Sequence, residues 1–78
     1  MRTVVHMNLV RQQVADRINA AMEAADETPY GLAQKALIPK STLLRKLAGG
    51  SSFTVDEIAA IAVALEIEPA ELVRGVAA

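Results

Sequence analysis

The stretch LAQKALIPKSTLLRKLAG, residues 32–49, contains two short apolar repeats separated by Leu37-Ile38-Pro39. Proline disfavours helical geometry in the residue before it and cannot continue a preceding helix, so a break falls between the repeats. The pattern therefore predicts a helix before the break and another from Pro39 or Lys40 to about Ala48. Two short helices joined by a turn of three or four residues are typical of a helix-turn-helix.

The first of these two helices has a well-marked start. Thr28 can cap its N-terminus, and Pro29 suits the first turn, where a backbone N–H has no partner, so we expect a helix to about Ala36. Upstream, apolar residues recur three and four positions apart from Leu9 to Ala25, which predicts an earlier helix with one buried stripe and Asn8 as its N-cap. The predicted stripe consists of Val10, Val14, Ile18, Ala21, Met22 and Ala25.

A further helix start follows the stretch 32–49. Gly49-Gly50-Ser51-Ser52 ends the preceding helix and forms a flexible connection. Thr54 and Glu57 then have the spacing of a capping box, and Phe53 stands in staple position to Ile58. The predicted inner face of this helix consists of Val55, Ile58, Ile61, Ala62 and Leu65.

The chain ends on one more helical segment. Glu66-Ile67-Glu68 interrupts the pattern, and Pro69 opens a short helix through Leu72 and Val73. Five predicted helices and no strand give an all-α fold. A chain of 78 residues has room for one core and none for a cleft, so we expect a single domain over 1–78, with residues 1–7 as a flexible or dimer-contacting segment.

Charge is segregated along the chain although the net charge is only −1. Residues 56–78 carry five acids against the single base Arg74. One surface can therefore be positive while the whole molecule is not, although charge runs are more often ordinary solvated helix faces. The bases between Thr28 and Val55, a segment without carboxylates, are Lys35, Lys40, Arg45 and Lys46.

Several classes of function are excluded by what the sequence lacks. Without cysteine there is no disulfide framework and no thiolate metal site. His6 is the only histidine and has no catalytic or metal-binding partners, while Asp56 and Glu57 are better explained by helix capping. Gly49-Gly50 lacks the lysine and helix start of a phosphate loop. We therefore expect no enzyme and no cofactor.

No run of residues approaches the length of a membrane span, and the opening residues become polar too quickly for a signal peptide. These observations predict a cytoplasmic protein without a membrane partner. Aromatic residues make up only 3% of the chain, which argues against stacking platforms for single-stranded nucleic acid.

Residues 32–49 also resemble the core of the lambda-repressor and Cro-like (Xre-type) DNA-binding domains. The loose pattern of those domains is Leu-Ala followed by three residues, then Gly-Val-Ser, two further residues and Thr-Ile-Ser-Arg. The segment FTVDEIAAIAVAL, residues 53–65, with Pro69-Ala-Glu-Leu is similar to the closing helices of the family, so the resemblance covers about Val10 to Val73. It implies a five-helix lambda-repressor-like domain whose partner is double-stranded DNA.

The sequence departs from that family at three positions. Leu37 and Glu66 stand where glycine is expected, and both sites favour a left-handed backbone, which costs a residue with a side chain about 1 kcal/mol. We therefore expect a strained turn at Leu37, or a turn wider than that of the family. Pro29 stands where related domains often carry a polar residue that donates to a phosphate.

The resemblance implies that the helix beginning near Lys40 reads the major groove with its N-terminal end. Lys40 and Ser41 match the two positions that reach base edges. Arg45 lies on the same side as Ser41, opposite Leu43 and Leu47, and its planar fork suits the paired acceptors of guanine.

The remaining candidate contacts are less specific. Leu44 sits at the rim of the buried stripe, where core packing is favoured over contact with a thymine methyl group. Other polar residues are placed to hold phosphates, which position a protein on DNA without reading its sequence. For each of them a solvated surface is the competing interpretation. The candidate phosphate contacts are Thr28, Lys35, Thr42, Lys46, Ser51 and Ser52.

Two hypotheses from different classes remain. The first is a sequence-specific regulator, such as a small phage repressor, a Cro-like regulator or an antitoxin, acting as a homodimer because one domain offers few cationic contacts. Its self-complementary patch would come from Val4, Val5, Val73 and Val76. The second is a protein-interaction module that keeps the fold and binds a host or partner protein; the weak net charge, Leu37 and Pro29 favour it.

Overall fold

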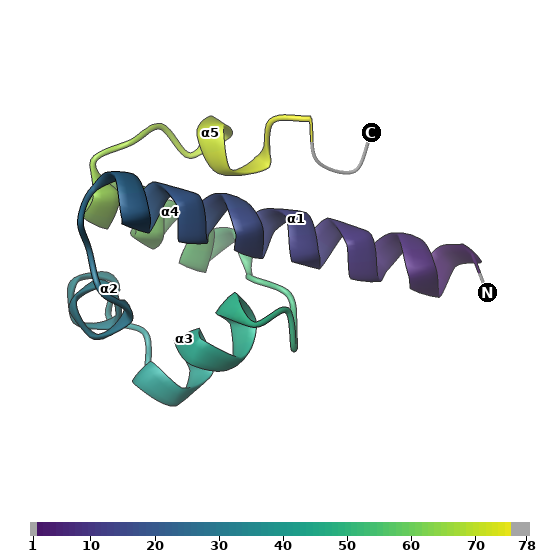
Figure 1. Cartoon of the computed structure of the whole chain (residues 1–78), viewed down its shortest axis with the longest axis horizontal. Helices are drawn as coiled ribbons and strands as arrows, with labels where there is room; N and C mark the ends of the chain where they lie inside the picture. Colours follow the sequence, from purple (N-terminus) through teal and green to yellow (C-terminus); the bar gives the residue numbers. More distant parts are fainter. Residues whose placement is uncertain (1, 76–78) are drawn as a thin grey trace.

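The computed structural model describes residues 2–75, with side chains from Val10 onward. This part of the chain consists of five helices and no strand: α1 (Arg2–Ala24), α2 (Pro29–Ala36), α3 (Lys40–Leu47), α4 (Val55–Leu65) and α5 (Ala70–Val73). The predicted all-α class is confirmed. In Figure 1 the long α1 crosses the molecule, with α4 behind it, α2 and α3 on one side and α5 on the other.

The first helix begins earlier than predicted. α1 is continuous from Arg2, so Asn8 lies inside it and is not an N-cap. The prediction was wrong because a capping residue needs non-helical backbone, and asparagine is tolerated within a helix when the flanking residues continue it. Residues 2–7 are part of α1, and a dimer-contacting role for them stays a prediction. The side chains of Val4 and Val5, and all of Val76, lie outside the described residues.

The predicted stripe of α1 is largely confirmed. Val14, Ile18 and Met22 are buried, and Ala21 packs against the same core. Ala25 is exposed because α1 ends before it, in a turn where Asp26 adopts a φ of 56°.

One fully buried side chain from each helix forms the centre of the core. Such positions leave little room for neighbours to close over a void, so truncating one of them to alanine is expected to cost about 2–5 kcal/mol. These five side chains are Ile18, Leu32, Leu43, Ile61 and Leu72.

The turn between α2 and α3 is compact and strained. Thr28 caps α2 through its Oγ1, which accepts from the Gly31 N–H at 3.0 Å, as predicted. At the other end Leu37 is left-handed, with φ 59° and ψ 40°, and the Ile38 N–H donates to the Ala33 carbonyl at 3.0 Å. A residue with a side chain thus occupies the expected glycine position, in a turn of three residues between α2 and α3, and Leu37 is 89% exposed.

The start of α4 follows the predicted capping box. The Glu57 N–H donates to Thr54 Oγ1 at 3.0 Å, and the Thr54 N–H donates to Glu57 Oε1 at 2.8 Å. At its end Glu66 is left-handed, with φ 58°, as predicted. Val55 is exposed, so its place on the inner face was wrong. Apolar spacing alone does not distinguish the rim of a stripe from its centre.

Candidate functional site

The outward face of α3 gathers the four candidate base contacts. Lys40, Ser41 and Arg45 are exposed, on the side opposite the buried Leu43 and Leu47. Their orientation follows from helical geometry, since the buried pair is four residues apart and fixes which side faces the core. The helix begins directly after Pro39, so the positive end of its dipole lies beside Lys40 and Ser41.

Leu44 belongs to this outward face. Its side chain is 43% exposed, so the expected core packing is wrong. Its position at the rim of the stripe allowed both outcomes, and the neighbouring helices cover Leu43 and Leu47 instead. Leu44 therefore gives this face one exposed apolar side chain, beside the bases Lys40 and Arg45.

An aromatic residue from α2 supports the first turn of α3. Lys40 Nζ lies 4.2 Å from the ring centroid of Tyr30, in the geometry of a cation–π contact. Tyr30 is itself 63% exposed, which places a ring and a hydroxyl beside the face. Sequence reasoning missed this residue, because no local spacing rule links positions in two different helices. The only available signal was that Tyr30 is the sole tyrosine of the chain.

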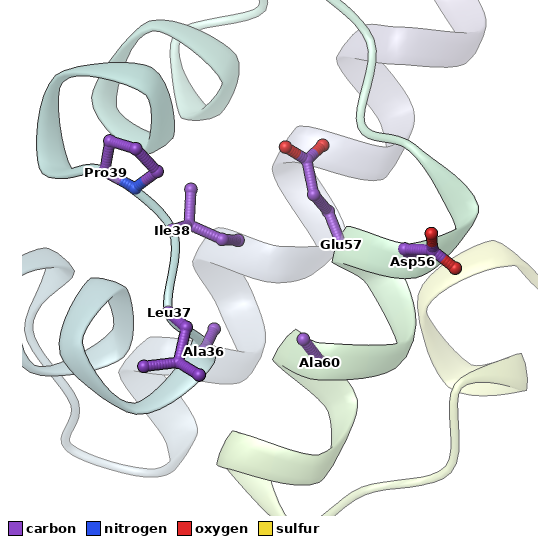
Figure 2. A pocket seen from close by; sticks show the side chains of 7 residues that line it. All are labelled: Ala36, Leu37, Ile38, Pro39, Asp56, Glu57 and Ala60. Carbon is purple, nitrogen blue, oxygen red and sulfur yellow. The ribbon is translucent and has the colours of Figure 1, made fainter.

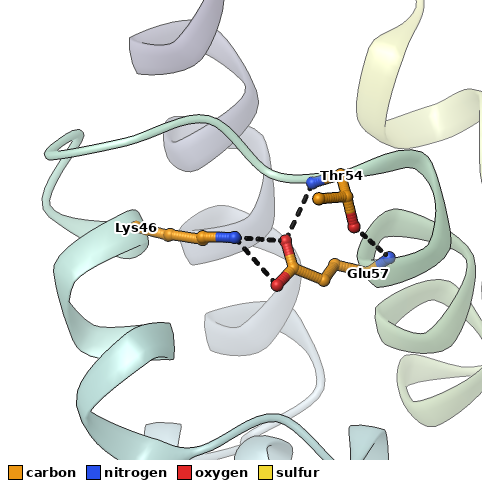
Figure 3. A network of polar contacts seen from close by, with 3 residues as sticks. All are labelled: Lys46, Thr54 and Glu57. Atoms are coloured by element: carbon orange, nitrogen blue, oxygen red, sulfur yellow. Dashed lines mark hydrogen bonds and ion pairs between the residues drawn. The ribbon is translucent and has the colours of Figure 1, made fainter.

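Lys46 lies on the other side of α3. It is only 8% exposed, and its Nζ donates to both carboxylate oxygens of Glu57, at 2.6 and 2.8 Å. Figure 3 shows the side chain running from α3 toward the start of α4. The expectation that Lys46 points outward to a phosphate is therefore wrong. Its side chain is turned to the buried side of α3, and its charge is neutralised by a partner from another helix.

The carboxylate of Glu57 has two structural roles. Burial raises its pKa, but the hydrogen bonds from Lys46 and from the Thr54 N–H outweigh that effect and hold the pKa below its ordinary value. The ionised form therefore closes the capping box and pairs with Lys46 at the same time (Figure 3). This carboxylate fastens the C-terminal turn of α3 to the N-terminus of α4.

Side chains of α1 hold the same end of α3. Asn19 Nδ2 donates to the Leu47 carbonyl at 3.2 Å, and Arg11 Nη1 donates to the Gly50 carbonyl at 3.3 Å. The last carbonyls of a helix have no partner within it, so Asn19 satisfies a group that α3 leaves open, while Arg11 holds the loop that follows the helix. The C-terminal end of α3 is thus fixed from two sides, while its N-terminal end faces solvent.

The predicted phosphate contacts are spread over several elements. Thr28 uses its oxygen as the cap of α2, and Lys35 is exposed but paired with Glu27, whose hydrogen bond raises the lysine pKa. Thr42 is half-buried on α3. In the loop before α4, Ser52 is exposed, whereas the Ser51 Oγ is buried and unpaired among the described residues. Lys40 and Arg45 are therefore the cations that the outward face itself carries.

A hollow of about 300 Å³ lies between the turn and α4. Figure 2 shows Leu37 and Pro39 on one wall and Asp56 and Glu57 on the other. Because Glu57 is already committed to Lys46 and Thr54, the two carboxylates do not form an acid–base pair. Among the side chains described from Val10 onward, no group of three or more histidine, aspartate or glutamate residues could hold a metal ion.

The described helices include none with the length and apolarity needed to cross a membrane.

A family model described as a Cro/C1-type HTH DNA-binding domain matches residues 17–77. This range includes α2 to α5 and begins inside α1, leaving the first turns of α1 outside the match. Neither a curated protein nor a solved structure matches the chain.

Proposed function

The chain belongs to the family of Cro/C1-type helix-turn-helix DNA-binding domains, and we propose that it acts as a sequence-specific regulator of transcription whose reading helix is α3. The observation that carries this proposal is the outward face of α3, where Lys40, Ser41, Leu44 and Arg45 are exposed together. A helix of this size fits the major groove of duplex DNA. No catalytic step is part of the proposal.

Each residue of that face has a distinct proposed role. Arg45 pairs its guanidinium with the two acceptors of a guanine, which is the commonest specific contact in the major groove. Lys40, held over the ring of Tyr30, reaches a second acceptor near the N-terminal end. Leu44 offers its side chain to a thymine methyl group, and Ser41 makes an adaptable hydrogen bond.

Contacts to the sugar-phosphate backbone position the domain. We assign them to Thr28 and Lys35 before α3, to Thr42 within it, and to the exposed Ser52 in the loop that follows it. Lys46 is not among them, because it is buried as well as paired with Glu57, whereas the paired Lys35 stays exposed. Its contribution is to hold α3 at a fixed angle to the rest of the domain.

Two copies acting together are part of the proposal. The outward face carries few cations, and the affinity of a protein for DNA depends on how many phosphates it neutralises. A dimer on a pseudo-palindromic operator, with half-sites about one helical turn apart, doubles those contacts. A repressor or Cro-like role follows if the operator overlaps a promoter. A cytoplasmic location is also part of the proposal, because a regulator has to reach its operator.

Selection of bound sequences from a random duplex pool tests this function directly. The selected duplex and a scrambled one are then titrated at several salt concentrations. We expect tight binding to the selected duplex, weaker binding to the scrambled one, and loss of both as salt rises. If no duplex is bound in a salt-dependent way, the DNA hypothesis fails. The protein-interaction module then takes its place, with the exposed Leu37 beside the hollow at α4 as its first candidate surface.

A further inference from the structure

α4 is apolar on all sides after its first turn. Residues 58–65 read IAAIAVAL and contain no polar side chain. A helix of this composition is normally buried all round, yet α4 buries only one side, through Ile61, Ala62 and Leu65. On the other side Val55 is 81% and Val63 77% exposed, with the exposed Ala59 between them. These three residues are four apart and form one outward apolar stripe.

The stripe continues into a groove formed with α5. A hollow of about 240 Å³ lies between α4 and α5, and only apolar residues line it: Val55, Ile58, Ala59, Pro69, Ala70 and Val73. We call this surface the α4–α5 face. The exposed charged residues next to its lining residues in the sequence are the acids Asp56, Glu68 and Glu71 and the single base Arg74. The face is thus apolar with a mainly acidic border.

The first turns of α1 have the opposite charge. Residues 1–10 contain no acid, and Arg2 is the base among them, followed by His6. The next base, Arg11, already donates to the Gly50 carbonyl of its own domain. The same segment is rich in apolar residues, among them Val4, Val5, Met7 and Leu9. In Figure 1 these turns extend beyond the other helices, and the family match begins only at residue 17. The domain therefore carries a basic, apolar helical extension as well as an acidic, apolar face.

We propose that the first turns of α1 in one copy pack on the α4–α5 face of a second copy, reciprocally across a two-fold axis. The lengths agree, since residues 2–9 and residues 55–63 of a helix each span about 10–12 Å. Packing α4 against its own copy would instead bring the acidic borders together, which like-charge repulsion disfavours. Because α1 is continuous from Arg2 to Ala24, its first turns do not fold back on their own domain.

This inference rests on the proposed function only in its need for two copies. A reciprocal exchange is an isologous contact, so each dimer contains it twice. Cross-linking and sedimentation equilibrium measure the contact in the absence of DNA. A failed contact is therefore distinguished from failed DNA binding, which the salt titrations measure separately.

Cross-linking between two single-cysteine variants tests the contact, because the chain has no cysteine of its own. Val5→Cys and Ala59→Cys proteins, one carrying a mass tag, are mixed under mild oxidation. We expect the mixed pair to cross-link many times more than either variant alone. Val5→Cys mixed with Ser41→Cys, an exposed position on α3, is the matched control. Cross-linking no greater than this control overturns the proposal, and so does equal cross-linking of Ala59→Cys with itself.

Charge exchange provides a second measurement on the full chain. Arg2→Glu and Glu71→Arg are each expected to raise the dimer dissociation constant about tenfold in sedimentation equilibrium, since each change acts at both contacts. The two changes in one chain restore opposite charges, so that variant should dimerise nearly as well as the original. Circular dichroism confirms that each variant is folded. A chain that sediments as a monomer at all concentrations, or a double variant weaker than both singles, overturns the proposal.

Discussion

The two ends of α3 carry the same kind of side chain in opposite situations. At the N-terminal end Lys40 is exposed and rests over Tyr30, while near the C-terminal end Lys46 is buried and paired with Glu57. Asn19 and Arg11 also bind carbonyls at or just beyond the C-terminal end. One end is therefore free to meet a ligand, and the other fixes the helix to the core. A lysine in a recognition helix contributes to binding or to rigidity according to what lies across from it.

Breaking the fixed end should have the largest effect. Lys46→Met leaves the Glu57 carboxylate without its cationic partner in a mostly buried place, and we expect a loss of about 2–4 kcal/mol in the free energy of unfolding. This range begins below the about 3–5 kcal/mol expected for a fully buried pair, because both side chains keep some exposure. Adding Glu57→Gln, which can still accept from the Thr54 N–H, should recover most of this loss. Urea unfolding measures both, and a double variant less stable than the single would contradict the assigned pairing.

The Lys46–Glu57 pair at the fixed end also predicts how the stability of the protein depends on pH. The folded pKa of Glu57 is lowered: burial raises it, but hydrogen bonds from Lys46 and Thr54 outweigh burial. Its contribution is therefore fully present above the ordinary glutamate pKa and is lost as pH falls through the lowered folded pKa. Thermal melts between neutral pH and pH 3 should show this loss, and Glu57→Gln should make the curve flatter. Identical acid profiles for the two proteins would show that Glu57 does not supply the dependence.

At the free end, Arg45→Ala should reduce affinity for the selected duplex by about 1–3 kcal/mol per half-site and affect scrambled DNA less. Arg45→Lys keeps the charge but loses the planar fork, so specificity should fall while the salt dependence is kept. Lys46→Met is the matched control, because its charge is turned inward. Measured where that variant is folded, its salt slope should equal that of the original protein. Equal losses for Arg45→Ala and Lys46→Met on both duplexes would remove the distinction between the two ends.

The turn that leads into the free end offers a smaller test. Leu37 is left-handed and exposed, so Leu37→Gly relieves strain of roughly 1 kcal/mol without removing a core contact. The greater freedom of glycine in the unfolded chain offsets part of this gain, and we expect a neutral or mildly stabilised protein. Glu66→Gly, at the equivalent corner after α4, is the matched variant. A loss of 2 kcal/mol or more, of the order expected for a buried leucine, would show that Leu37 packs in the core.

The smallest effect is expected at the ring beneath Lys40. Tyr30→Ala removes a cation–π contact at an exposed site, worth about 0.5–1 kcal/mol, and should weaken discrimination at the base that Lys40 reads. Tyr30→Phe keeps the ring and tests the hydroxyl separately. Titrations on duplexes that differ at single bases measure both variants. If Tyr30→Phe loses as much as Tyr30→Ala, the hydroxyl and not the ring is the important group.

Interactions between residues close in the sequence were enough to predict most of the backbone conformation. The ends of α2 and α3, the capping box of Thr54 and Glu57, and the left-handed corners at Leu37 and Glu66 all follow from interactions within a few residues. The start of α1 was missed because Asn8 is acceptable both as a cap and inside a helix. A residue that suits both positions is helical when the residues on both sides of it are helical.

For the candidate site, the sequence by itself determined which residues share the outward side of α3, because the buried pair Leu43 and Leu47 fixes the helix orientation. The tertiary structure alone decided the side chains at the rim: Leu44 faces outward, Lys46 turns inward and Tyr30 lies under Lys40. The reason is physical. Backbone conformation is encoded by neighbours along the chain, whereas the direction of a side chain at the edge of a stripe depends on which group from another helix lies within its reach.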